Sequence, residues 1–591
     1  MAKITINGTQ LKVKKGTTIL KAAESLGYKI PTLCFMEEIN EIGFCRVCVV
    51  EVEGEQDLVS SCNTEVANGM VIETESEKVL NARKTTLALL ASRHRFDCWR
   101  CPKDGSCEFY DLLKENDVVF EEFGPGIGRN PEQIFGTGIS QDQSKCVLCK
   151  RCVAVCNEVV TAKVLKFRDE DGTNPTVSPT VGLEFDDAGC IFCGQCTKVC
   201  PTGTLHETDH IQKVQALLRD KNKGVYVQVA PAVRASLAEE FGYPIGTPVR
   251  ETQGKMYRAL ELLGFDTVTD TNWAADLTIM EEGTELIKRI QTNGQLPLFT
   301  SCCPAWVRYA ELYRPEYLEN LSSAKSPHMM QGSLIKHYYG PKYANQKPEN
   351  IAVVSIMPCT AKKYEISRPE MEVDGVRDID AVLTVRELAK MIKRAGIDFR
   401  RLEDATVDNP LAQFTGAGTI FGASGGVTEA ALRTVYEVLE GSELPGIEYH
   451  DVRGATFNSY EGTIKEATIN LKKTGMKLNV AVVHGGAAIK RMFEILDSGK
   501  KQYHFIEFMA CPGGCVNGGG MPITNDLSVA EVVKLRAQSL YDQDAQDMEY
   551  RKSHDNPAIQ KVYAEFLQEA NSPEAHKYCH THYTQKAFTK E

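Results

Sequence analysis

Cysteine provides most of the chemistry that this chain can carry out. Three apolar runs in its second half end in cysteine, with the sequences PLFTSCC, VVSIMPC and FIEFMAC, and the last continues as PGGC. Thiolates are soft ligands that suit iron–sulfur clusters. These runs offer four such ligands from separate strand ends, with Cys302 left as a reactive neighbour: Cys303, Cys359, Cys511 and Cys515.

The other cysteines are concentrated in the first part of the chain, where fifteen of the 21 precede residue 201. A disulfide framework is one interpretation, but the total is odd, no secretory signal is evident and C-x2-C spacing repeats as it does around metal centres. Zinc is the next alternative, and it favours isolated groups of four ligands. We therefore expect iron–sulfur clusters.

Two separate ligand sets precede residue 110. The first has C-x10-C-x2-C-x13-C spacing, which departs from the plant-type run but supplies four ligands for a 2Fe-2S cluster: Cys34, Cys45, Cys48 and Cys62. The second set is predicted to hold a 4Fe-4S cluster and consists of His94, Cys98, Cys101 and Cys107. His94 alone would be a solvated histidine at a helix end, but these three thiols otherwise lack a fourth ligand.

The most specific local signal is C-x2-C-x2-C-x3-C, which occurs at 146–156 and again at 190–200. This is the bacterial ferredoxin repeat, in which the fourth cysteine of each run binds the other cluster. One 4Fe-4S centre is then held by Cys146, Cys149, Cys152 and Cys200, and its twin by Cys190, Cys193, Cys196 and Cys156.

The elements that must position these ligands follow from periodicity. Residues 3–13 alternate around Asn7-Gly8, which predicts a hairpin, and helices are expected at 18–26 and 76–93. From about residue 210, apolar strands alternate with amphipathic helices, which indicates an α/β domain with a mainly parallel sheet. Ligands of such folds gather at the carboxyl ends of strands, where the cysteines of the second half lie.

The predicted architecture is a multidomain protein of α+β and α/β class. Its expected domains are a β-grasp 2Fe-2S domain (1–77), a 4Fe-4S domain with one histidine and three cysteine ligands (78–125), a two-cluster ferredoxin domain (126–209), a large α/β domain (210–545) and a C-terminal tail (546–591). The tail contains His576, Cys579, His580 and His582, which could bind a metal. Because their spacing fits no standard zinc pattern, we favour a surface or docking tail without metal.

Composition excludes several classes of partner. A net charge of -12 and a pI near 5.6 argue against nucleic acid, which requires clustered lysine and arginine. No stretch approaches the roughly 18 apolar residues that a membrane span needs. No GxGxxG follows a predicted strand, so any NAD or flavin should be bound by another chain. We expect a cytoplasmic protein that works with small molecules or other proteins.

Three long motifs resemble, in order, the signature motifs of the FeFe (iron-only) hydrogenases: TSCCPAW at 300–306, MPCTAKKYE at 357–365 and EFMACPGGCVNGGG at 507–520. The resemblance extends to most of the chain. It implies a catalytic subunit that oxidises H2 and reduces protons reversibly at an H-cluster in the domain at 210–545. That cofactor joins a 4Fe-4S part, bound by Cys303, Cys359, Cys511 and Cys515, to a di-iron unit with CO, cyanide and an azadithiolate, to which Cys515 would form a bridge.

The same resemblance assigns roles around the cofactor. Heterolytic cleavage of H2 requires a nearby base and an exit for protons, and the implied proton carriers are Cys302, Glu282, Glu285 and Ser322. Lys362 would donate to a cyanide ligand, and the residues implied beside the di-iron unit are Met357, Met509, Pro231 and Ala232. From the residues alone, Cys302 would be a buried structural thiol and the two glutamates solvated helix charges.

Two positions depart from the family pattern, because His328 and Met521 stand where glutamine is usual. Alternatives to a hydrogenase are an electron-transfer or assembly scaffold and a hydrogen sensor, since the first 200 residues also resemble the large iron–sulfur subunit of respiratory NADH dehydrogenase. The retained Cys302 and Glu282 oppose both. One 2Fe-2S and three accessory 4Fe-4S clusters would relay electrons to ferredoxin, to flavin- and NAD-binding subunits of a hetero-oligomer, or to both.

Overall fold

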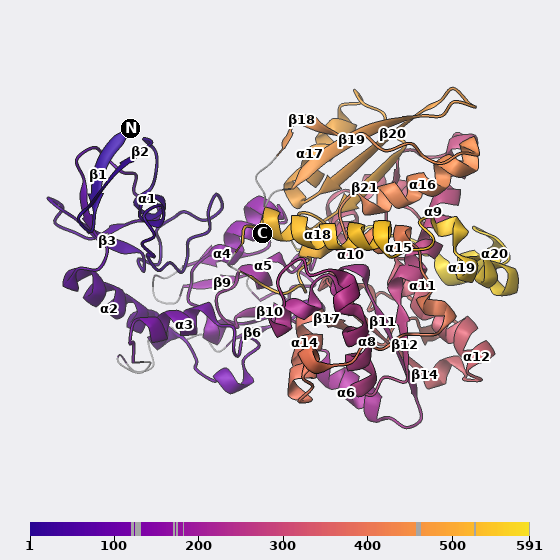
Figure 1. The fold of residues 1–591 in the computed structure, drawn as a ribbon, viewed down its shortest axis with the longest axis horizontal. Coiled ribbons are helices and arrows are strands. Elements are labelled where there is room, and N and C mark those ends of the chain that lie inside the picture. The colour runs from indigo at the N-terminus through magenta and orange to yellow at the C-terminus, as the bar shows by residue number, and fades with distance from the viewer. Residues whose placement is uncertain are drawn as a thin grey trace.

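The computed structural model describes residues 1–119, 123, 132–169, 172, 175–180, 182–456, 462–524 and 527–589, without the side chains of 453–456. The N-terminal domain lies at one end of the molecule, and helices α2 and α3 lead from it toward a ferredoxin-like part and a large domain (Figure 1). The domain boundary predicted at 125/126 lies outside the described residues.

The N-terminal domain is a five-stranded sheet with the order β2-β1-β5-β3-β4. The predicted hairpin is formed by β1 (Ala2–Ile6) and β2 (Thr9–Val13), joined by Asn7 at φ 47° and Gly8 at φ 78°. Both turn residues are left-handed, as in a type I′ turn. The sheet is completed by β3 (Val49–Val52), β4 (Val59–Ser60) and β5 (Val71–Glu73), and it packs with α1 (Ile19–Glu24), which confirms the predicted β-grasp.

The next two parts are built from short elements around cysteine loops. Helix α2 (Glu77–Arg93) is capped at its N-terminus by Ser76, whose side chain accepts from the Val79 N–H, and is followed directly by His94. It is followed by a 3-10 turn (Cys98–Arg100) and by α3 (Glu108–Glu115). The ferredoxin-like part contains β6 (Gln133–Ile134), β7 (Ile139–Asp142), α4 (Arg151–Ala154), β8 (Lys166–Arg168), β9 (Thr176–Ser178), α5 (Gln195–Val199) and β10 (Leu205–Glu207).

The large domain contains two main sheets. One has the order β12-β11-β14-β17 and is wholly parallel, and the other has the order β13-β21-β20-β19-β18, in which β13, β21 and β20 are parallel. Every residue of β11 (Gly224–Val229) and β14 (Ile351–Met357) is buried, as expected of parallel strands covered on both faces. The other strands are β12 (Thr267–Asp270), β13 (Leu298–Phe299), β17 (Ala381–Thr384), β18 (His450–Thr456), β19 (Thr463–Asn470), β20 (Lys477–His484) and β21 (Phe505–Met509).

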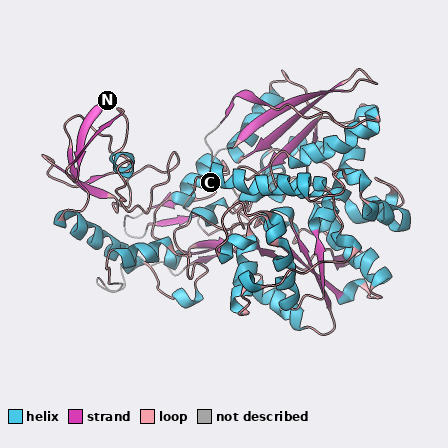
Figure 2. Ribbon diagram, in the orientation of Figure 1, coloured by secondary structure: helices cyan, strands magenta, loops and turns pink. Residues whose placement is uncertain are grey.

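Helices surround both sheets of the large domain (Figure 2). They are α6 (Ile211–Arg219), α7 (Pro231–Arg234), α8 (Gln253–Leu262), α9 (Thr271–Gln291), α10 (Pro304–Tyr313), α11 (Pro327–Leu334), α12 (Gly340–Tyr343), α13 (Ala361–Glu365), α14 (Val385–Arg394), α15 (Gly416–Ile420), α16 (Gly426–Glu440), α17 (Gly486–Asp497) and α18 (Val529–Gln546). A small ladder joins β15 (Glu372–Val373) to β16 (Val376–Arg377). This mixture of parallel strands and helices confirms the predicted α/β class.

The C-terminal segment is not the surface tail that its polar composition suggested. It forms α19 (Pro557–Val562), a π-helical turn (Tyr563–Leu567) and α20 (Pro573–Cys579), and its apolar side chains belong to the main core of the large domain. Leu567 and Cys579 have no exposed surface. The prediction was wrong because average polarity conceals apolar residues at helical spacing, which bury one face of each short helix.

Among the described residues, no helix is long and apolar enough to cross a membrane.

Candidate active site

One cavity in the large domain is lined by all five cysteines that end its apolar runs: Cys302, Cys303, Cys359, Cys511 and Cys515. They come from both sheets, because Cys302 and Cys303 follow β13, Cys359 follows β14, and Cys511 follows β21. Most of the remaining lining is apolar and includes the four residues predicted beside the cofactor, Pro231, Ala232, Met357 and Met509. The fold thus brings together side chains more than 200 residues apart in sequence.

The thiols around this cavity are close enough to influence one another. Burial, followed by the charges of Cys303 and Cys515, raises the pKa of Cys511 to about 12. Within the described residues, no three His, Cys, Asp or Glu side chains converge as ligands of a single metal ion do. Four soft donors spread around one cavity instead fit a cluster, whose several irons hold the ligands apart.

Backbone geometry allows the two cysteines of the CPGGC loop to face the cavity. Gly514 has φ 87°, a left-handed conformation that favours glycine, and a Cβ there would lie 2.6 Å from the Ser424 nitrogen. On the opposite wall, Cys303 precedes α10, whose first residue is Pro304. Proline at this position ends the strand segment and starts the helix without losing a hydrogen bond.

The ferredoxin-like part touches the cavity wall directly. A Cβ on Gly519 would lie 2.3 Å from the Cys193 carbonyl oxygen, so the two backbones meet without an intervening side chain. The Gln195 side chain donates to the Asn517 carbonyl at 3.0 Å, and Cys511 Sγ lies 4.0 Å from the Cys193 carbonyl oxygen. A predicted ligand of one cluster therefore lies against a predicted ligand of the next.

Within the ferredoxin-like part, the fourth cysteine of each run lies near the opposite run. Burial, followed by the charges of Cys149 and Cys200, raises the pKa of Cys152. Burial raises the pKa of Cys190 to about 12, and the charge of Cys156 contributes in the same direction. This exchange is the arrangement that the repeated spacing predicts.

The four thiols of the N-terminal domain form two close pairs. A hydrogen bond from Cys45 lowers the pKa of Cys34 to about 6, and one from Cys62 lowers the pKa of Cys48 to about 6. All four are buried. The four donors of the predicted 2Fe-2S set therefore lie close together, with Cys45 and Cys48 before β3 and Cys62 after β4.

The histidine-containing set lines a second pocket, which includes His94, Cys98, Cys101 and Cys107. His94 Nδ1 lies 2.9 Å from the Lys145 carbonyl oxygen, which can only accept a hydrogen bond. The Nδ1 proton is thereby held, and Nε2 carries the lone pair that a metal needs. The three cysteines are partly exposed, unlike the buried thiols of the 2Fe-2S set.

Lys362 lies at the cavity within a small polar network. Its Nζ donates to the Cys302 carbonyl at 3.0 Å and to Glu365 Oε2 at 2.7 Å. His328, which also lines the cavity, has Nε2 at 2.7 Å from the same Glu365 oxygen and Nδ1 at 3.1 Å from Ser355 Oγ. Although burial opposes it, the charges of Lys362 and His328 hold the pKa of Glu365 at about 2.

The predicted proton carriers lead away from the same cavity along α9. Glu282 is 1% exposed, and burial, followed by the charge of Glu285, raises its pKa to about 8. Among the residues that the structure describes, neither Glu282 oxygen has a hydrogen-bond partner, although the Ser322 hydroxyl is close enough to stabilise its charge. Burial, followed by the charge of Glu282, raises the pKa of Cys302.

Farther from the cavity, Ser322 and Glu285 form a direct hydrogen bond. Ser322 Oγ donates to Glu285 Oε2 at 3.0 Å, and Arg289 donates to Glu285 Oε1 at 2.7 Å. Both members of this ion pair are partly exposed. The predicted proton carriers therefore extend from Cys302 beside the cavity to Glu285, which is paired with the partly exposed Arg289.

Sequence reasoning missed several residues of this region. Glu365 follows Lys362 by three positions on one helix, and that spacing could have identified the pair. No comparable signal exists for Ser323 and His580, which meet across 257 residues. Of the two departures from the family pattern, His328 lines the cavity, whereas Met521 is absent from its lining and has no exposed surface.

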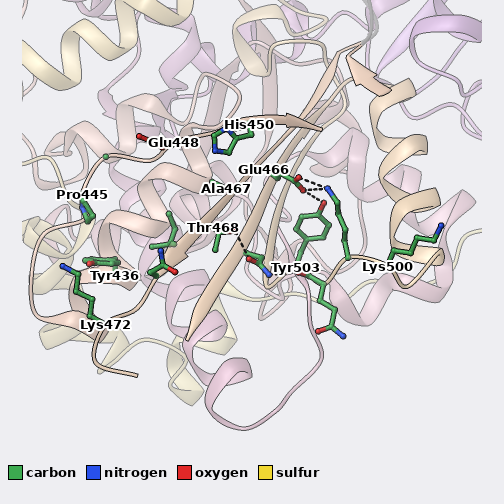
Figure 3. A pocket seen from close by; sticks show the side chains of 16 residues that line it. Tyr436, Pro445, Glu448, His450, Glu466, Ala467, Thr468, Lys472, Lys500 and Tyr503 are labelled. Carbon is green, nitrogen blue, oxygen red and sulfur yellow. Dashed lines mark hydrogen bonds and ion pairs between the residues drawn. The ribbon is translucent and has the colours of Figure 1, made fainter. Parts of the chain in front are cut away.

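A separate cavity of about 740 Å³ lies beside β18 and β19 (Figure 3). There Glu466 accepts from Lys501 at 2.7 Å and from Tyr503 at 2.8 Å. None of the predicted site residues lines it. It is therefore distinct from the cysteine-lined cavity.

Comparison with known proteins connects these features. Family models match as follows: "Iron only hydrogenase large subunit, C-terminal domain" at residues 223–519, "2Fe-2S iron-sulfur cluster binding domain" at 1–77, "4Fe-4S dicluster domain" at 145–204 and "Iron hydrogenase small subunit" at 530–586. The last match covers most of the buried C-terminal segment.

Similar proteins extend over the whole chain. Iron hydrogenase 1 of Clostridium pasteurianum is 44% identical over 99% of this chain and 100% of its own length. The NADP-reducing hydrogenase subunit HndD of Solidesulfovibrio fructosivorans is 44% identical over 99% of both chains. A solved structure of the FeFe-hydrogenase HydA(deltaEFG), described for stepwise H-cluster assembly, is 37% identical, covers 64% of this chain and 99% of its own, and has a TM-score of 0.57.

The matched domains account for iron–sulfur clusters in the N-terminal half and for an H-cluster domain around the cysteine-lined cavity. This protein belongs to the iron-only hydrogenase family, as a large subunit with a small-subunit-like C-terminal segment, and is an oxidoreductase that acts on H2.

Proposed function

We propose that the cysteine-lined cavity holds the H-cluster through Cys303, Cys359, Cys511 and Cys515, with Cys515 as the bridge to the di-iron unit. When bound, this cofactor supplies the redox-active iron at which H2 is activated. The observation that carries the proposal is that all four thiols line one largely apolar cavity together with Met357, Met509, Pro231 and Ala232. Such walls exclude water, which strengthens every polar interaction inside.

We assign proton transfer to Cys302, Glu282, Ser322 and Glu285, in that order from the cavity. Support comes from the raised pKa of Glu282, which is about 8 because of burial and the Glu285 charge. A carboxyl group with a pKa near neutrality both donates and accepts protons readily. From Glu282 the proton would pass by way of the Ser322 hydroxyl, which donates to Glu285 at 3.0 Å.

We assign Lys362 to an anionic cyanide ligand, in keeping with its position in the cavity lining and its ion pair with Glu365. Its ammonium is a strong donor to an anionic acceptor. His328 would fix Glu365 from the other side through the shared Oε2 atom. Glutamine at this position would offer one amide oxygen and one NH2 group in place of the two ring nitrogens.

Electrons would pass through four accessory clusters. We assign a 2Fe-2S cluster to Cys34, Cys45, Cys48 and Cys62, and a 4Fe-4S cluster to His94, Cys98, Cys101 and Cys107. The two ferredoxin-type 4Fe-4S clusters would be bound by the two cysteine sets predicted from the sequence, in which the fourth cysteine of each run binds the other cluster. The backbone contact of Cys193 with Gly519, beside Cys511, supports a direct last step to the H-cluster.

The electron partners are part of the same proposal. The name of the relative HndD describes an NADP-reducing hydrogenase subunit, which supports flavin- and NAD-binding partner subunits for this chain, with ferredoxin as a further partner. The first four domains predicted from the sequence would serve as the modules of this assembly, with the C-terminal segment packed into the fourth. The cytoplasmic location remains a prediction.

Infrared spectroscopy of the full chain, produced in a host with the maturation enzymes, tests the central assignment. Iron-bound CO and cyanide absorb where protein does not, so their bands are expected in the purified enzyme. Cys359→Ser should abolish these bands, whereas Cys62→Ser should leave them and remove the 2Fe-2S paramagnetic signal. Intact CO and cyanide bands in Cys359→Ser would exclude the proposed ligand set.

A further inference from the structure

The C-terminal segment reaches the residues proposed for proton transfer. His580 forms a β-bridge with Ala324, the Thr581 N–H donates to the Ser323 carbonyl at 2.7 Å, and the Lys325 N–H donates to the Cys579 carbonyl at 2.7 Å. The strand-like segment that starts at Ser322 is therefore held by residues more than 250 positions away. This pairing gives the segment at 579–581 a fixed position beside α9.

His580 connects two acidic residues of α9 through its ring. Its Nε2 lies 3.0 Å from Glu281 Oε2, and its Nδ1 lies 2.9 Å from Ser323 Oγ. Ser323 in turn approaches Glu285, because its N–H donates to Glu285 Oε2 at 3.2 Å and its hydroxyl lies 3.4 Å from the same atom. The His580 side chain is 3% exposed and Glu281 is fully buried.

These distances determine where the Ser323 hydroxyl points. The Glu281 carboxylate accepts hydrogen bonds from Tyr563, from the Asn571 N–H and, in the same way, from the Nε2–H of His580. With the ring proton on Nε2, Nδ1 is the hydrogen-bond acceptor of the imidazole. The Ser323 hydroxyl then donates to His580 at 2.9 Å rather than to Glu285 at 3.4 Å.

Glu285 Oε2 is also the acceptor for Ser322 Oγ, at 3.0 Å. Two adjacent serine hydroxyls thus lie within reach of one carboxylate oxygen, and only one of them, Ser322, lies on the proposed proton route. By accepting the other hydroxyl, His580 removes a competing donor and leaves this oxygen available to Ser322.

We infer that His580 is a positioning residue for proton transfer, because it turns the Ser323 hydroxyl away from Glu285 and so keeps the Ser322-to-Glu285 bond open for proton passage. The inference rests on the proposed proton route. It gives the small-subunit-like segment a role in turnover beyond covering the core.

Two conservative variants separate the contacts of His580. In His580→Asn the side-chain amide occupies the place of Nδ1 and can still accept from Ser323, whereas in His580→Gln the amide reaches the place of Nε2 and retains only the Glu281 contact. We expect H2 evolution within about twofold of wild type for His580→Asn and roughly tenfold slower for His580→Gln, with a larger solvent isotope effect, because the route depends on a correctly oriented hydroxyl.

Removal of the competing hydroxyl provides the decisive control. Ser323→Ala alone should stay near the wild-type rate, and adding it to His580→Gln should restore that rate to within about threefold. All rates are measured on matured full-length enzyme and normalised to the infrared bands of the H-cluster, so a poorly accumulating variant still gives a rate per active site. His554→Asn, on the same segment but bonded to Thr434, should match wild type.

The outcomes separate this inference from the proton route on which it rests. Slow turnover in His580→Asn, or no recovery in the His580→Gln/Ser323→Ala double variant, overturns the positioning role. Glu285→Gln at the wild-type rate would instead refute the proton route itself. Slow turnover in Glu285→Gln together with wild-type turnover in His580→Gln would refute only the role of His580.

Discussion

At the scale of single residues, burial sets the charge of the groups proposed to carry protons. Cys302 and Glu282 are both enclosed, and burial, the largest effect on each, raises both pKa values. A solvated glutamate would be ionised at neutral pH and would hold no proton to donate. The same side chain placed inside the large domain is protonated for much of the time near pH 7.

Cys302→Ser tests the first proton carrier. Serine has nearly the same shape but a hydroxyl far less acidic than a thiol, so proton exchange with the cavity should fail. We expect turnover to fall by about 100-fold or more, since this is the usual contribution of a positioned acid or base. Infrared and paramagnetic signals of all clusters should persist, and turnover close to wild type would exclude Cys302 from the route.

Glu282→Gln tests the pH dependence of stability. The folded-state pKa of Glu282 is about 8, above the ordinary value of 4.5, because of burial and then the Glu285 charge. The folded protein therefore binds a proton that the unfolded chain releases, and the free energy of unfolding falls as pH rises from about 4.5 to about 8. Glutamine does not titrate, so this variant should lose less thermal stability than wild type between pH 5 and pH 8.

The matched comparison for this measurement is Glu494→Gln, a glutamate at the surface in an ion pair with Arg491. Its melting temperature should follow the wild-type curve across the same pH range. If Glu282→Gln shows the wild-type decline in melting temperature, Glu282 does not have the raised pKa described above.

At the scale of elements, two loops place the ferredoxin-like part, which carries the proposed accessory clusters, against the wall of the cysteine-lined cavity. The loop at 193–195 and the loop at 517–519 meet through backbone atoms, and this approach depends on small residues on both sides. Because electron transfer weakens steeply with separation, their contact decides how well the last accessory cluster serves the H-cluster.

Gly519→Ala tests this contact. The added Cβ would lie 2.3 Å from the Cys193 oxygen and 2.6 Å from the Gly194 Cα, so the loops must separate. We expect a stability loss of about 1–3 kcal/mol from overpacking, together with slower ferredoxin-driven H2 evolution per H-cluster. Gly446→Ala is the control, because no described atom lies within 4 Å of its Cβ position. Unchanged rates in Gly519→Ala would show that the loop contact does not limit electron transfer.

At the scale of the whole molecule, the proposed accessory ligand sets follow one another from the N-terminal domain to the large domain. The N-terminal domain stands apart from the large domain, with α2 and α3 leading between them (Figure 1). His94 lies at the end of α2, where the histidine-containing ligand set begins. Loss of the cluster proposed for this ligand set should leave the H-cluster intact but change the route by which electrons reach it.

His94→Ala should therefore lose one 4Fe-4S paramagnetic signal and keep the CO and cyanide bands, because its ligand set does not contribute to the cavity. His94→Cys replaces the nitrogen donor with a thiolate and should retain the cluster signal at a shifted potential. A full set of cluster signals in His94→Ala would show that this histidine is not a ligand.

The sequence alone determined the features that depend on neighbouring residues. The turn at Asn7-Gly8, the helix that ends at His94 and the repeated spacing of the ferredoxin cysteines are local, and local geometry follows from a few adjacent side chains. The order of the three long motifs indicated the family, and strand-end positions indicated that Cys303, Cys359 and Cys511 would converge. These properties can be predicted from the sequence because each is encoded within a short segment.

Only the tertiary structure decided the contacts between distant segments. The burial that raises the Glu282 pKa, the contact of His328 with Glu365, the approach of Cys193 to Gly519 and the contact of His580 with Ser323 all depend on residues whose spacing carries no periodic signal. The C-terminal segment was misjudged for a different reason, because its average composition is polar although its apolar side chains complete the core. Such contacts depend on how whole elements pack, and packing is a property of the folded chain as a unit.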